Sequence, residues 1–201
     1  MLISTMVLGW IGVLLFLGII FTVQKMMKNN EFAFIHILMA LMYAMWLPLP
    51  LALNQLLNSE FQVVGTIFGF VYLIMLIITM ALQTGHITYL VKYNDDEAIT
   101  DEQGSYMMAT LSNQFELIAN IFKCIWALFL ALTFLNNGEM VMASLMFLFS
   151  LLIFYYLFIL LDISLVKRIK LFSKVKPNPF VVNLETLFFF IILMTYITIN
   201  I

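Results

Sequence analysis

The chain has 201 residues, of which 64% are hydrophobic and 10% are charged. One water-soluble core cannot cover so much apolar surface, which excludes a soluble globular protein and predicts a membrane protein. A net charge of −2 provides no basic surface for nucleic acid, so no nucleic-acid partner is expected. Cys124 is the single cysteine, which excludes an intramolecular disulfide and a cysteine-based zinc motif.

Polar residues divide the sequence into apolar runs that are long enough to cross a membrane. About 20 helical residues span a hydrocarbon layer of about 30 Å. Six runs reach this length: 1–23, 32–57, 61–93, 106–135, 140–166 and 179–201. The segments between them carry the Asn, Gly, Pro and charged residues that end apolar helices. The sequence therefore predicts a single all-α domain of six transmembrane helices, a multi-pass protein of the cell membrane.

Basic residues predict the orientation of these helices, because Lys and Arg near helix ends are retained on the cytoplasmic side during insertion. The first, third and fifth loops hold eight of them: Lys25, Lys28, Lys92, Lys167, Arg168, Lys170, Lys174 and Lys176. The other loops and both ends of the chain hold none. The acidic residues of the third loop, which include Asp95 and Asp96, have little weight in this rule. Both termini are therefore expected on the extracytoplasmic side.

Four polar residues form a stripe on the fourth predicted helix. Asn113, Glu116, Asn120 and Lys123 follow one another at spacings of three, four and three. Such spacings fall within an arc of about 80° on a helix. Because helical side chains lean toward the N-terminus, we expect Lys123 to point back toward Asn120 and Glu116. This stripe is either a paired lysine that holds the bundle together or a path for protons or substrate.

Further polar residues fall in the same predicted cytoplasmic third of the membrane. They are His36, Gln83, His86, Asp162, Asn183 and Glu185. We expect these residues to bind one another and the stripe, as one intramembrane polar cluster. Imidazole and carboxylate groups can bind a divalent metal, but no two of them share a short ligand motif, so neither a metal nor another cofactor is expected. No catalytic motif is present either, so no enzyme activity is expected and no catalytic residue is assigned.

Small residues and prolines predict local packing. Gly65 and Gly69 form a G-x-x-x-G pair that allows close helix contact, within the bundle or in a dimer. Pro48 and Pro50 remove two backbone donors and predict a kink in the second helix. Asn178 before Pro179 predicts an N-cap followed by proline at the first position of the sixth helix.

One part of the sequence is similar to known proteins. It is the stretch from Asn30 to Pro50, NEFAFIHILMALMYAMWLPLP, with Leu8-Gly9-Trp10 before it. It resembles uncharacterised polytopic membrane proteins of low-GC Gram-positive bacteria, of the kind encoded beside type VII secretion toxins. The resemblance covers about the first third of the chain and carries over no functional residue. It implies an immunity or accessory protein of a secreted, membrane-acting toxin.

Two functions therefore stay open at the level of sequence. The first is a non-enzymatic protein that lies in the lipid bilayer and acts by helix contacts with another membrane-inserted protein, such as a toxin. The second is a small ion-coupled transporter built on the polar cluster around Lys123. The oligomeric state is not predicted.

Overall fold

A computed structural model describes residues 1–93, 97–167 and 169–201 of the chain. Within these ranges all regular structure is helical, and six segments have the length and apolar composition needed to cross a membrane. The predicted all-α fold with six transmembrane helices is thereby confirmed. The predicted loop residues Asn94, Asp95 and Asp96 and the basic residue Arg168 lie outside the described residues.

The first three spans follow the predicted ranges closely. Helix α1 (Leu2–Lys28) continues through the two lysines that were expected in the first loop, because lysine is a good helix former. Helices α2 (Phe32–Trp46) and α3 (Leu49–Leu57) share the second span, and the break between them confirms the kink predicted at the prolines. Helix α4 (Glu60–Tyr93) is the third span.

The fourth span, Glu102–Asn136, starts before its predicted range of 106–135. It lies in a helical stretch made of helix α5 (Glu97–Met107), the π-helix η1 (Met108–Asn113) and helix α6 (Gln114–Asn136). The apolar pattern detects only the part of a helix that lies in lipid, whereas helix formation continues into the polar residues before it. A π-helical turn has no signature in hydrophobic spacing, so the prediction missed η1.

The last two spans start at the predicted residues. Helices α7 (Met140–Leu151) and α8 (Ile153–Ser164) share the fifth span and meet at Leu152. After the short 3₁₀-helix η2 (Phe172–Lys174), helix α9 (Pro179–Ile199) forms the sixth. The Asn178 side chain accepts hydrogen bonds from the backbone N–H groups of Phe180 at 3.1 Å and Val181 at 3.3 Å, as expected of an N-cap.

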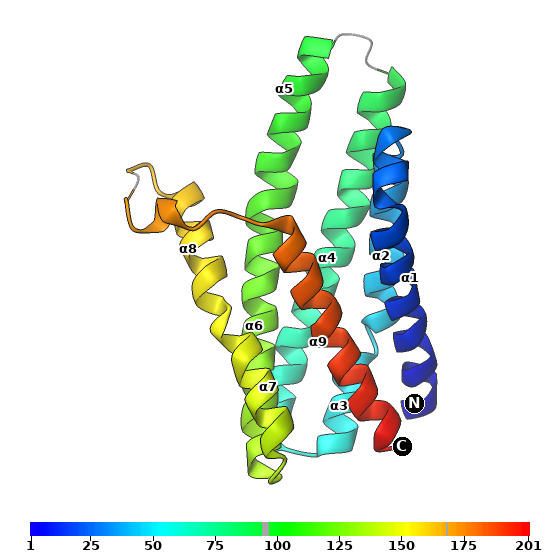
Figure 1. The fold of residues 1–201 in the computed structure, drawn as a ribbon, viewed down its shortest axis with the longest axis vertical. Coiled ribbons are helices and arrows are strands. Elements are labelled where there is room, and N and C mark those ends of the chain that lie inside the picture. Colours follow the sequence, from blue (N-terminus) through cyan, green and yellow to red (C-terminus); the bar gives the residue numbers. More distant parts are fainter. Residues whose placement is uncertain (94–96, 168) are drawn as a thin grey trace.

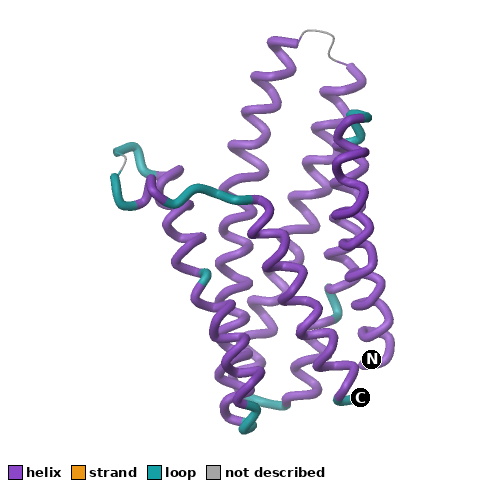
Figure 2. The backbone as a smooth tube through the Cα atoms, in the orientation of Figure 1, coloured by secondary structure: helices purple, strands orange, loops and turns teal. Residues whose placement is uncertain are grey.

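Both termini lie at one end of the bundle, and the C-terminal ends of α1, α4 and α8 lie toward the other (Figure 1). We call the second end the basic end. Lys25, Lys28 and Lys92 lie in the last turns of α1 and α4, and Lys167, Lys170, Lys174 and Lys176 lie between α8 and α9. Helices α4 and α5 project beyond the other helices there. Figure 2 shows the long connection from α8 to α9 crossing the side of the bundle. The extracytoplasmic location of the termini stays a prediction.

The helices are arranged in an open order. Neighbouring helices follow the sequence α9, α1, α2, α4, α6 and α8, with α3 on α4 and α7 on α6. Helices α8 and α9 are therefore the two ends of the row, and they diverge toward the basic end (Figure 1). Side chains that bond α8 to α9 therefore join the two ends of the row, and the strength of these bonds determines how firmly the two helices are held together.

Aromatic side chains fill the centre of the bundle. The ring of Trp46 stacks on Phe190 with centroids 3.7 Å apart and planes at 9°. Phe16 and Tyr43 meet Trp46 edge-on at 6.1 Å and 5.9 Å. The indole N–H of Trp46 donates a hydrogen bond to the backbone oxygen of Gly9 at 3.0 Å. These contacts hold α1, α2 and α9 together by packing and hydrogen bonding, which are the forces that associate helices in lipid.

Gly65 and Gly69 face other helices of the same chain. A Cβ atom at Gly65 would lie 2.9 Å from Cβ of Phe129 on α6. At Gly69 it would lie 2.8 Å from the ring of Trp126 and 3.0 Å from Cγ of Pro50. The close approach of α4 to α6 and α3 therefore uses this glycine surface inside the bundle.

The close contact between α1 and α2 gives a test of the packing. We expect Gly12→Ala to lower the free energy of unfolding by about 1–3 kcal/mol through overpacking, because the new Cβ would lie 2.6 Å from Nε1 of the fixed Trp46 ring. Gly18→Ala is the matched control on the same helix, since its Cβ would meet nothing within 4 Å. The control should be neutral or stabilising by up to about 1 kcal/mol. Reversible unfolding by SDS in mixed micelles measures both, and equal losses would contradict the packing described here.

Candidate functional site

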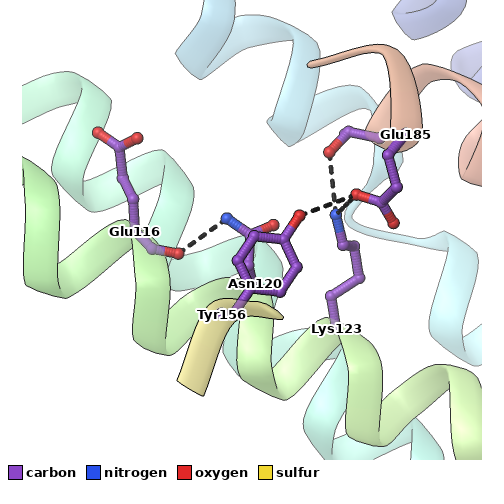
Figure 3. A network of polar contacts seen from close by, with 6 residues as sticks. Glu116, Asn120, Lys123, Tyr156 and Glu185 are labelled. Atoms are coloured by element: carbon purple, nitrogen blue, oxygen red, sulfur yellow. Dashed lines mark hydrogen bonds and ion pairs between the residues drawn. The ribbon is translucent and has the colours of Figure 1, made fainter. Parts of the chain in front are cut away.

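Lys123 on α6 is buried in the interior of the bundle, with 1% of its surface exposed. Its Nζ forms an ion pair with Oε2 of Glu185 on α9 and donates a hydrogen bond to Oγ1 of Thr186 at 3.0 Å (Figure 3). Tyr156 on α8 donates its hydroxyl to the same Glu185 oxygen at 3.1 Å. The rings of Tyr72 and Tyr156 lie 5.6 Å and 5.7 Å from Nζ, within cation–π range. Through these contacts one lysine on α6 reaches α4, α8 and α9, so it connects four helices of the bundle.

The expected pairing of Lys123 with Glu116 on its own helix is wrong. Seven residues separate the two, which is about 10 Å along a helix. Asn120, one turn from Lys123, instead donates its Nδ2 to the backbone oxygen of Glu116 at 2.9 Å. A buried ammonium group pairs with the nearest carboxylate, and Glu185 lies directly across the helix interface.

Glu116 belongs to a second hydrogen-bond group, between α6 and α4. Its Oε1 accepts hydrogen bonds from Nε2 of Gln83 at 3.0 Å and from Oγ of Ser112 at 2.7 Å. Gln83 also donates to Oγ1 of Thr79 at 3.0 Å, and Thr79 donates to the backbone oxygen of Leu111. The Glu116 carboxylate is therefore fixed by neutral donors, without a cationic partner among them.

The π-helix η1 explains which residue of the stripe faces inward. Its wider turn leaves Ser112 buried and Asn113 exposed, so the hydroxyl takes the place that 100° spacing assigns to the amide. The same turn presents the Leu111 carbonyl to Thr79. Single π-helical turns often mark functional sites, which directs attention to the space beside η1.

A cavity of about 430 Å³ adjoins both groups near the basic end of the bundle. Residues of α2, α4, η1, α6, α8 and α9 line it. Its polar lining consists of His36, Gln83, Ser112, Asn113, Glu116, Asn120, Tyr156, Asn178 and Asn183. The remaining lining is mostly apolar and includes Met39, Met80, Leu117, Ile159 and Val182. The cavity thus combines a carboxylate and several amides with an apolar wall.

The structure distributes the predicted polar cluster over four places. Lys123 and Glu185 form the ion pair, while Asn113, Glu116, Asn120 and His36 line the cavity. Two members lie outside both groups. The Nε2 of His86 is 3.3 Å from the backbone oxygen of Gln103 on α5. Asp162 on α8 has one buried oxygen without a hydrogen-bond partner, and it does not line the cavity.

Sequence reasoning missed five participants in the site: Tyr72, Thr79, Ser112, Tyr156 and Thr186. A single hydroxyl in an apolar helix gives no signal by itself, and its role depends on which neighbour it faces. His36 forms only a local contact, with Nδ1 2.7 Å from the backbone oxygen of Phe32. Among the described residues, no group of three His, Cys, Asp or Glu side chains is placed to hold a metal ion.

Six apolar spans with charged groups inside them define a multi-pass helical membrane protein with a polar interior. Comparison with models of protein families, with curated proteins and with solved structures finds no match for the chain. The cavity and the ion pair are the features of the chain that bear on its function.

Proposed function

We propose that the protein is a small ion-coupled carrier of the cell membrane that binds its substrate in the cavity beside Glu116. The observation that carries the proposal is the cavity itself, about 430 Å³ in volume and lined by Glu116 and several amide side chains. Ligand sites typically occupy about 300–1,000 Å³ and combine apolar walls with a few polar groups. Ionisable groups inside a membrane are costly, and they commonly mark substrate and ion paths.

Tyr156 links the cavity to the ion pair. Its side chain lines the cavity and its hydroxyl donates to Glu185, the partner of Lys123. A substrate that competes for this hydroxyl weakens a contact between α8 and α9, the two ends of the helical row. Binding in the cavity would then favour separation of these helices, which is the kind of differential contact that a conformational change needs.

Currents in proteoliposomes on a solid-supported membrane test the carrier function. Pools of amines, amino acids, sugars and organic anions are added in turn, and we expect one class to give a transient current. Lys123→Ala should abolish this current, because Glu185 then lacks its partner. Asp162→Asn is the matched control, since it removes a carboxylate on α8 that does not line the cavity. No current from the intact protein with any class, or an unchanged current in Lys123→Ala, would reject the function.

The helix-contact function that the resemblance implies has one feature in its favour. A groove of about 450 Å³ lies between α7 and α9, with apolar lining except for Glu185. Leu148 and Phe188 in this groove are exposed, and an apolar transmembrane helix of a toxin would cover them. This second candidate is tested by co-expressing the toxin encoded beside the gene and recording membrane depolarisation. Equal depolarisation with and without the protein rejects it, and Leu148→Trp should reduce protection if it holds.

A further inference from the structure

We propose that the cavity beside Glu116 binds a primary ammonium group attached to an apolar body. This inference names the substrate class of the proposed carrier and rests on that function for its physiological role. Binding itself is separable from transport and can be measured without it.

The cavity holds an acceptor without a partner, the side-chain oxygen of Asn120. Asn120 is 6% exposed and lines the cavity, and its Oδ1 is buried without a hydrogen-bond partner. The amide is oriented by its Nδ2, which donates to the backbone oxygen of Glu116 at 2.9 Å (Figure 3). Buried polar atoms in native proteins are normally satisfied. A ligand that donates hydrogen bonds would satisfy this oxygen.

The Glu116 carboxylate lies one helical turn before Asn120 and lines the same cavity. The hydrogen bonds that the described side chains donate to the Glu116 carboxylate both end on Oε1. Oε2 is therefore the acceptor that the network leaves for a ligand. Residues four apart on a helix have Cβ atoms about 5–6 Å from each other. An ammonium group has three donors, so one group can bind Glu116 and Asn120 together.

The charged lining of the cavity is acidic. Glu116 is the only carboxylate among the described lining residues, and none of these residues is Lys or Arg. Lys123 is nearby, but Glu185 already neutralises it. Glu116 is half-buried, and a charge that is partly removed from water favours a nearby counter-charge. The cavity therefore favours a cation and disfavours an anion.

The apolar wall of the cavity suits an organic cation better than an inorganic one. Met39, Met80 and Leu117 face the same space as the carboxylate. Methionine side chains adapt to ligands of irregular shape. A hydrated inorganic ion would leave this wall uncovered, whereas an aryl or alkyl amine covers it.

Equilibrium binding of tritiated 2-phenylethylammonium to the full chain in lipid nanodiscs tests the inference, with empty nanodiscs subtracted. We expect saturable binding that 2-phenylethanol and 3-phenylpropionate, of similar shape, compete for poorly. Glu116→Gln keeps an acceptor for Gln83 and Ser112 but removes the charge, and should weaken binding roughly ten-fold or more. Asp162→Asn is the matched control and should bind as the wild type does.

A variant that binds the ammonium more tightly is needed as well, because a loss of binding can also come from misfolding. Asn113 lines the cavity and is exposed, so Asn113→Asp adds a second carboxylate and should tighten binding of the ammonium but not of the alcohol. Unchanged binding in Glu116→Gln, or equal competition by 2-phenylethanol, would overturn the ammonium site. Amine binding without any current would keep the site and reject the carrier. A current with another class and no amine binding would do the reverse.

Discussion

Lys123→Met should lower the free energy of unfolding by about 3–5 kcal/mol, the usual cost of leaving one member of a buried ion pair without its partner. Glu185 would then be a charged side chain, only 9% exposed, inside the bundle. The hydroxyl groups of Tyr156 and Thr186 cannot compensate for a full charge. Reversible SDS unfolding in mixed micelles measures the loss.

The double variant Lys123→Met/Glu185→Gln separates the pair from the packing around it. No charge remains to be compensated, so most of the lost stability should return. Lys25→Met, at the exposed end of α1, controls for removal of a lysine and should change stability by less than about 0.5 kcal/mol. A double variant as unstable as the single one would show that the lysine stem, and not the ion pair, stabilises the bundle.

Features that depend on one segment could be predicted from the sequence. The six spans follow from the length of each apolar run, the kink follows from Pro48 and Pro50, and the start of α9 follows from Asn178 and Pro179. The position of each polar residue along its helix also follows, which is why Lys123 and Glu185 were expected in the same part of the bundle. Each of these properties is local and needs no knowledge of helix neighbours.

The partners of the buried groups could not be predicted, because they depend on helix order and rotation. Glu185 lies 62 positions from Lys123 and meets it only because α9 faces α6 across the interior. His86 and Asp162 lie on α4 and α8, which both contribute to the cavity, but neither residue lines it. Tyr156 enters the site because it lies between the ends of an open row of helices, which no pattern within α8 indicates.

Trp46→Ala should lower the free energy of unfolding by about 3–5 kcal/mol, through the lost contacts and the cavity left behind. Trp46 is fully buried, and its stack on Phe190 at 3.7 Å is a main contact that holds α9 in the bundle. Trp10→Ala on α1 is the matched control, because Trp10 also contacts α9. Trp10 is partly exposed and bonds α9 only near its end, through Thr198 at 3.0 Å, so its loss should be clearly smaller.

The same variant tests whether the core positions the ion pair. Phe190 lies five residues from Glu185, about 7.5 Å along α9, so a shift of the ring would also shift the carboxylate. Cys124, the single cysteine, is buried beside Lys123 and serves as a native probe. Its rate of reaction with N-ethylmaleimide should rise in Trp46→Ala and stay unchanged in Trp10→Ala. If Trp46→Ala destabilised the protein without raising this rate, α9 would hold Glu185 in place independently of the aromatic core, and the ion pair itself would be what positions the helix.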